Sequence, residues 1–76
     1  MAAKATRLKR FSPEKLRRLR GDLSHVMLSA KITEKTGVDI NPMTLRKWED
    51  GEMIPGSDRL AAVANFFGIP IDDLFE

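Results

Sequence analysis

Apolar residues recur every three or four positions early in the chain, which is the spacing of one face of an α-helix. The series begins at Leu16 and continues through Leu19 and Leu23. The Ser-Pro-Glu run at residues 12–14 is typical of a helix start, because serine caps a free N–H group and proline loses nothing at the first helical position. We therefore predict a first helix over about residues 13–23.

A second helix is predicted around residue 32, with two candidate start residues. Ser29 fits as its N-cap, with Ser24 as the alternative, because a serine oxygen accepts a hydrogen bond from a free N–H of the first turn. Gly37 then ends the helix, since glycine adopts the left-handed backbone that commonly follows a last helical turn.

A third, short helix is predicted after the Asn-Pro pair at residues 41–42. Asparagine is a good N-cap and proline is pre-organised for the first helical position, so the pair marks a helix start. Leu45 and Trp48 lie three residues apart, and we expect both to face the core. The helix should end one or two residues before Gly51.

The last third of the chain predicts one longer helix and a closing turn. Ser57 is the expected N-cap of the helix and Gly68 its expected end. The apolar face between them consists of Leu60, Val63, Ala64 and Phe67. A fifth helix should begin after Pro70 and close the core with Ile71, Leu74 and Phe75. No segment alternates as a half-buried strand does, so we expect a compact all-α fold.

Composition bounds the size and class of the protein. With 76 residues, 42% of them hydrophobic and none of them cysteine, the chain is in the range of one small domain without disulfides. It has one histidine and no tyrosine, and its carboxylates fall mostly at helix starts, where a structural role suffices. We therefore expect no enzyme, no metal site and no cofactor. No uncharged stretch approaches the roughly 18 apolar residues that cross a bilayer.

Charge is divided unevenly along the chain. Residues 1–47 hold 12 of the 13 lysines and arginines and four acids, a net charge of +8. Residues 48–76 hold one arginine and seven acids, a net charge of −6. Such a basic half is typical of a protein that binds a polyanion such as DNA. A membrane-surface segment or an acidic protein partner would need the same division, so charge alone leaves both open.

The beginning of the chain is a separate basic segment. It contains no acid, and its basic residues are Lys4, Arg7, Lys9 and Arg10. We expect a flexible arm over residues 1–11 that orders on DNA, followed by the folded domain over residues 12–76. A short organelle-targeting segment is the alternative. The first helix adds a basic face that is either solvated or directed at phosphates, made of Lys15, Arg17, Arg18 and Arg20.

Two short helices joined by a turn with glycine, the second of them basic, have the order of a DNA-reading helix-turn-helix. The segments EKTGV at residues 34–38, MTLRKWEDG at residues 43–51 and IPIDDLF at residues 69–75 resemble the Cro/phage-repressor (XRE-like) helix-turn-helix family. The resemblance covers about residues 12–75. It implies a five-helix domain that binds DNA through its third helix.

The chain departs from the family pattern at three places. The connection between Gly37 and Asn41 is about two residues longer than usual, and a similar excess lies between the first two helices. Ser29 stands where many members have a glutamine that meets a phosphate. Glu52 follows Gly51 where members commonly have a basic residue, so DNA affinity should depend more on the arm and the first helix.

The resemblance also implies which residues meet DNA. The base-reading positions fall on Pro42, Met43, Arg46 and Lys47, with Ser29, Asn41 and Thr44 near phosphates. Proline donates no hydrogen bond and methionine offers only apolar contact, suited to a thymine methyl group. Hydrogen-bonded reading therefore falls on Lys47 and Arg46, which suit guanine O6 and N7. Pro42 as a plain helix opener and Met43 as a half-buried residue remain the alternatives.

These observations predict a cytoplasmic transcriptional regulator of prokaryotic or phage type that reads double-stranded DNA with residues 42–49, as a homodimer on DNA. The alternative is a protein-interaction adaptor or antitoxin-like partner on the same fold. Its partner would meet the acidic C-terminal half and an apolar end made of Ile71, Leu74 and Phe75. RNA binding is less favoured. Trp48, Phe66 and Phe67 have the spacing of buried helical positions, and the sequence predicts no β-sheet with aromatic residues on which bases could stack.

Overall fold

The computed structural model describes residues 9–76, and there the expected helices follow in the expected order. They are α1 (Pro13–Arg20), α2 (His25–Thr36), α3 (Pro42–Glu49), α4 (Ser57–Phe67) and the 3-10 helix η1 (Ile71–Leu74). Strands are absent from this part of the chain, which confirms the all-α class. None of its helices is long and apolar enough to cross a membrane.

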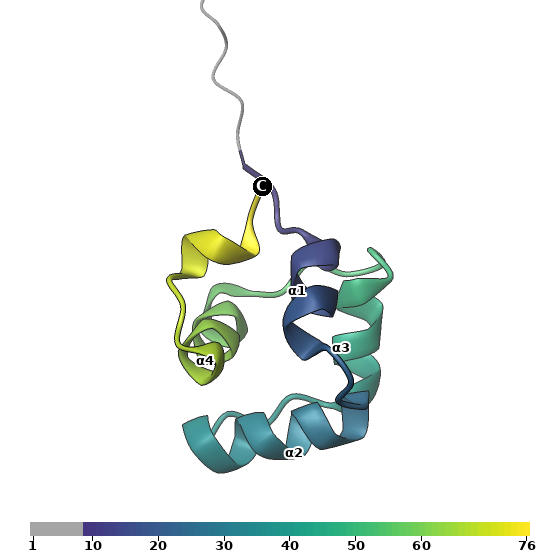
Figure 1. Ribbon diagram of the computed structural model, residues 1–76, viewed down its shortest axis with the longest axis vertical. Helices are drawn as coiled ribbons and strands as arrows, with labels where there is room; N and C mark the ends of the chain where they lie inside the picture. Colours follow the sequence, from purple (N-terminus) through teal and green to yellow (C-terminus); the bar gives the residue numbers. More distant parts are fainter. Residues whose placement is uncertain (1–8) are drawn as a thin grey trace, which may run out of the picture.

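The helices surround one apolar core. Figure 1 shows α1 and α3 side by side, α2 crossing below them, and α4 with η1 on the left. α2 packs against both α3 and α4, while α1 packs against α3 and η1. Leu45 and Trp48 of α3 face inward as expected, with exposed fractions of 0% and 2%. The other buried apolar side chains are Leu16, Leu28, Ile32, Ile40, Leu60, Ala62, Val63, Ala64 and Leu74.

The start of α1 follows the prediction and its end does not. The Ser12 side chain accepts a hydrogen bond from the Lys15 backbone N–H at 3.2 Å, as an N-cap does. The helix ends at Arg20 rather than near Leu23, because Gly21 takes a positive φ of 58° and turns the chain away. Leu23 still packs against the core from the connecting turn.

α2 begins earlier than the Ser29 cap predicts, so that prediction is wrong and the alternative start is observed. The Ser24 side chain accepts from the Met27 backbone N–H at 3.1 Å and caps the helix. The additional residues between the first two predicted helices therefore form the first turn of α2. Ser29 is inside the helix and only 8% exposed.

The long connection between α2 and α3 is held by side chains of α2. Gly37 ends α2 with a φ of 78°, as expected. Thr33 Oγ1 donates to the Val38 carbonyl at 3.2 Å, and the Ser29 hydroxyl donates to the carbonyl of Ile40. Ile40 is fully buried, so the residues that lengthen this connection place an additional apolar side chain in the core.

α4 is capped differently from the prediction and ends as predicted. Gly56 occupies the N-cap position with no side-chain hydrogen bond, and Ser57 is the first helical residue. Gly68, with a φ of 70°, ends the helix. The expected fifth helix is one turn of 3-10 helix, so the described residues form four α-helices and this turn, and the count of five is not confirmed. It stops because the chain becomes extended at Phe75 to pair with the start of the domain.

The two ends of the folded domain are paired. The backbone groups of Arg10 and Glu76 exchange two hydrogen bonds of 3.0 and 2.9 Å, and Phe11 and Phe75 form an isolated antiparallel bridge. The two phenylalanine rings meet edge to face, with centroids 6.4 Å apart. Arg10 and Phe11, at the end of the expected arm, are thus paired with the last residues of the chain.

Candidate nucleic-acid interface

α3 presents its polar side away from the core. Asn41 caps it, its side-chain oxygen accepting from the Met43 backbone N–H at 2.7 Å, and Pro42 occupies the first turn. With Leu45 and Trp48 turned inward, the other face of the helix is left to residues of the predicted site. Asn41, Met43 and Arg46 are exposed there, and Pro42, Thr44 and Lys47 are partly exposed.

Three long side chains, those of Met43, Arg46 and Lys47, lie on this outward face. The Arg46 side chain is 66% exposed, and its Nε lies 3.9 Å from Asp50 Oδ2, one helical turn on. An exposed pair at that distance is weak, so the guanidinium can exchange it for another acceptor. The Met43 side chain is 57% exposed. The face thus combines a guanidinium, an ammonium and a thioether on about two turns of helix.

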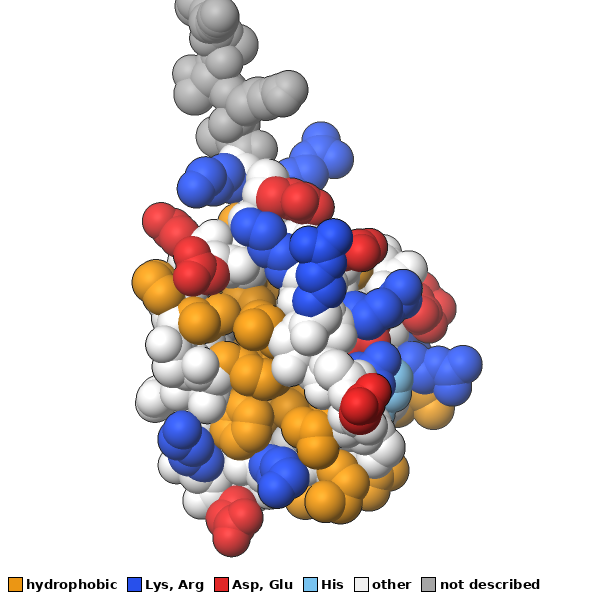
Figure 2. All heavy atoms as spheres, in the orientation of Figure 1, with side chains coloured by type: hydrophobic (Ala, Val, Ile, Leu, Met, Phe, Trp, Pro, Cys, Tyr) orange, Lys and Arg blue, Asp and Glu red, His pale blue; other side chains and the backbone are white. Residues whose placement is uncertain are grey.

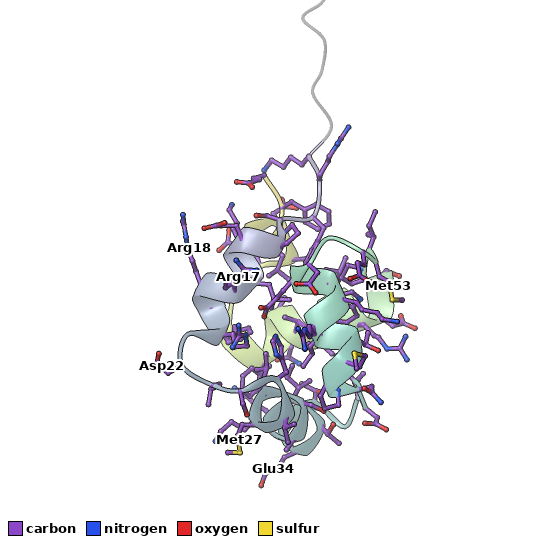
Figure 3. The ribbon with its side chains drawn as sticks, turned by 90° about the vertical axis from the view of Figure 1, so that its right-hand side faces the viewer. Arg17, Arg18, Asp22, Met27, Glu34 and Met53 are labelled. Atoms are coloured by element: carbon purple, nitrogen blue, oxygen red, sulfur yellow. The ribbon has the colours of Figure 1, made fainter. Side chains whose placement is uncertain are left out.

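Arg17 of α1 lies beside the end of α3. Its Nη2 donates to the Glu49 carbonyl at 3.5 Å, and its Nε lies 3.8 Å from Glu49 Oε1. The side chain remains 56% exposed. Figure 3 shows Arg17 on α1, to the left of α3, and Met53, in the loop after α3, at the right. The structure thus places an exposed basic residue of α1 next to the predicted reading helix.

A buried carboxylate ties α3 to its neighbours. The Glu49 side chain is 3% exposed, and Arg20 of α1 donates two hydrogen bonds to it, from Nε at 2.7 Å and Nη2 at 2.9 Å. His25, the first residue of α2, places Nε2 3.2 Å from Glu49 Oε1, off the direction of a good hydrogen bond. Helices α1, α2 and α3 therefore meet at one side chain.

The charges of this cluster are set by their contacts. Burial alone would raise the pKa of Glu49, but the hydrogen bond from Arg20, the neighbouring His25 and the charge of Arg20 outweigh it. The pKa of Glu49 is consequently below its ordinary value. The same hydrogen bond raises the pKa of Arg20. Both groups are thus held in their charged forms.

Sequence reasoning missed the Glu49 cluster. Glu49 and Asp50 are adjacent acids, and their charge alone does not show which of the two is buried. Arg20 is 29 positions away along the chain. The sequence does contain one indication that Glu49 is buried: it directly follows Trp48 and so lies close to the apolar face of α3.

The remaining predicted residues fall in three places. Ser29 is turned inward, with its hydroxyl committed to Ile40, so the structure separates it from the expected phosphate contact. Lys9 and Arg10 are exposed at the start of the described chain, where the Arg10 backbone pairs with that of Glu76. Lys4 and Arg7 lie outside the described residues.

The order and packing of α2, the connection and α3 are those of a helix-turn-helix. A model of the helix-turn-helix family HTH_3 matches residues 14–74, which is most of the chain. The protein belongs to this family of Cro/phage-repressor-like domains. Comparison with curated proteins and with solved structures gives no match. The HTH_3 domain assigns the chain to the DNA-binding transcription regulators.

Proposed function

We propose that this HTH_3 protein binds duplex DNA sequence-specifically, with α3 in the major groove. The observation that carries the proposal is the division of α3 into two faces. Leu45 and Trp48 anchor the helix in the core, while Met43, Arg46 and Lys47 point to the outside. A recognition helix reads base edges with such an outward face.

Each outward residue has a role that its chemistry allows. Lys47 and Arg46 donate to guanine O6 and N7, and Met43 packs against a thymine methyl group. Pro42 brings no donor and pre-organises the helix start. Asn41 uses its side-chain oxygen as the cap, which leaves its NH₂ group to donate to a phosphate, with Thr44 close by.

Phosphate contacts outside α3 come from basic residues near the fold's surface. Arg17 is held beside Glu49 and is more than half exposed, so its guanidinium is pre-positioned for a phosphate. Lys9 and Arg10, with Lys4 and Arg7 before them, supply further charge along the backbone. Ser29 is omitted from the proposed interface because its hydroxyl is buried and bonded.

We infer that the protein acts on DNA as a two-fold dimer. One α3 of eight residues touches only a few base pairs. Two copies reading half-sites about 34 Å apart multiply the discrimination. The expected target is therefore a palindromic site.

Selection of bound sequences from a random duplex pool tests the proposal. A regulator of this kind enriches a short motif in two inverted copies, and Arg46→Ala loses preference for guanine at one position of each copy. Arg59→Ala, an exposed arginine on α4, is the matched control and should select the same motif as the wild type. A pool that shows no enrichment, with binding that depends only on salt, would refute sequence-specific reading.

A further inference from the structure

The end of α3 carries two adjacent acids whose side chains have different surroundings. Glu49 is directed into the fold, where Arg20 donates two hydrogen bonds to it. Consecutive residues of a helix lie about 100° apart around its axis, so the side chain of Asp50 emerges on another side of α3. Asp50 is exposed. The burial of Glu49 therefore leaves Asp50 as the carboxylate beside the outward face of α3.

The backbone that carries Asp50 is held at the end of the helix. Its N–H donates to the Arg46 carbonyl at 2.9 Å, and the Glu52 N–H donates to the Lys47 carbonyl at 2.9 Å. Gly51, between these two donors, takes a positive φ of 78° and turns the chain out of the helix. The aspartate side chain is short, so its carboxylate stays close to the place that this backbone gives it.

Arg46 lies one helical turn before Asp50, and their side chains are neighbours on the surface of α3. The Arg46 Nε is 3.9 Å from Asp50 Oδ2, and the two side chains are 66% and 43% exposed. In water such a pair contributes little. When α3 enters a groove of DNA, water leaves the contact and the attraction between the two charges becomes stronger. The contact uses the Nε side of the guanidinium and leaves the two Nη groups to donate to a base.

The surroundings of this pair contain charges of both signs. Figure 2 shows hydrophobic side chains gathered between α1 and α4, and basic and acidic side chains close together on the right, where α3 lies. Lys47 adds a cation on α3, and Glu52 adds an exposed carboxylate in the loop that follows. The cations attract phosphates and the acids repel them, so the acids lower the affinity of this side of the molecule for DNA of any sequence.

We propose that Asp50 is a positioning residue that holds the Arg46 guanidinium in the orientation that reads guanine. With Nε directed at Asp50, the two Nη groups form a fork that points away from the carboxylate, and such a fork matches O6 and N7 of guanine. An arginine that is already oriented loses less side-chain entropy on binding. This role rests on the proposed DNA binding and deepens it by naming a residue that determines its specificity.

Selection from a random duplex pool, followed by binding titrations, tests the proposal with Asp50→Asn, which keeps the size of the side chain and removes its charge. At the position where Arg46→Ala loses its preference for guanine, the preference of Asp50→Asn should fall about fivefold, the upper end of what an exposed ion pair contributes. Binding of Asp50→Asn to a duplex of unrelated sequence should become tighter, because a negative charge near the phosphates is removed.

Glu52→Gln is the matched control, because it removes one negative charge from an exposed side chain two residues further on. It should tighten binding to the unrelated duplex as Asp50→Asn does, and leave the preference for guanine unchanged. Adding Asp50→Asn to Arg46→Ala should change no base preference further, because Asp50 acts through Arg46. Circular dichroism of each variant separates a change in DNA reading from loss of the fold.

Three outcomes would overturn the proposal. The first is a preference for guanine in Asp50→Asn equal to that of the wild type. The second is an equal loss of preference in Glu52→Gln, which would make the loss a general effect of charge. The third is a further change in preference when Asp50→Asn is added to Arg46→Ala, which would show that Asp50 meets a base itself. All three leave the proposed DNA binding in place, whereas a wild-type protein that enriches no motif refutes both.

Discussion

Arg20 and Glu49 form a two-point hydrogen-bonded ion pair that joins the end of α1 to the last residue of α3, with N–O distances of 2.7 and 2.9 Å. The pair is shielded, with exposed side-chain fractions of 18% and 3%. A fork of two parallel hydrogen bonds fixes orientation as well as distance. The orientation of α3 relative to α1 is therefore fixed in part by this ion pair.

Removing Glu49 should be strongly destabilising. Glu49→Ala leaves the Arg20 guanidinium partly buried without its carboxylate, which costs about 3 kcal/mol when a buried pair loses one partner. A domain this small has little more than that to lose. Urea denaturation followed by circular dichroism measures the effect, with the exposed Glu52→Ala as the matched control. A free energy of unfolding within about 0.5 kcal/mol of the wild type would contradict the prediction.

Acid should unfold the protein partly through Glu49. Its pKa is lower in the folded protein than the ordinary 4.5, so its contribution to stability is complete above that value. The contribution is lost as the pH falls below 4.5 and through the depressed folded pKa. The melting temperature should accordingly fall below pH 4.5, and Glu49→Gln should flatten this part of the curve. An equally steep fall in Glu49→Gln would assign the acid sensitivity to other carboxylates.

Lys47 should carry base discrimination. Lys47→Ala is expected to weaken binding to the best site by about 1–3 kcal/mol and to relax preference at one position, since the lysine donates to a guanine. Binding titrations on the best site and on single-base variants measure both effects. If all sequences weaken equally, Lys47 contacts a phosphate instead.

The basic start of the chain should contribute salt-dependent affinity. Because Arg10 is hydrogen-bonded to Glu76, the truncation that spares the fold removes residues 1–9 and with them Lys4, Arg7 and Lys9. If each of these side chains neutralises one phosphate, the truncation reduces the slope of log K against log salt by about 2.7. Titrations at four salt concentrations give the slope. No change in slope, with an unchanged melting temperature, would show that these charges do not meet phosphate.

Ser29 should matter for stability and not for DNA. Ser29→Ala leaves the Ile40 carbonyl without its donor in a buried place, at a cost of about 1–3 kcal/mol. Ser24→Ala, which removes the observed cap of α2, should cost about 1 kcal/mol. Chemical denaturation measures the cost of each change. Equally weakened binding of the folded Ser29→Ala protein to all DNA sequences would instead make this serine a phosphate contact.

The sequence by itself determined the features that depend on neighbouring residues. Asn41 and Pro42 open α3 as expected, and Gly37 and Gly68 end their helices, because caps and left-handed turns act within four residues. The inward turn of Leu45 and Trp48 follows from their spacing. The motifs at residues 34–38, 43–51 and 69–75 were sufficient for the family.

Only the tertiary structure decided which of several equivalent local signals is used. Ser24 and Ser29 are both good caps, and packing Ser29 against the carbonyl of Ile40, 11 positions away, selected Ser24. Glu49 and Asp50 are adjacent acids, and the contact with Arg20 selected Glu49 for burial. The pairing of Arg10 with Glu76 drew residues of the expected arm into the fold and limited the last helix to one turn. These contacts join distant segments, and their free energy exists only once the helices have packed, so no local pattern encodes them.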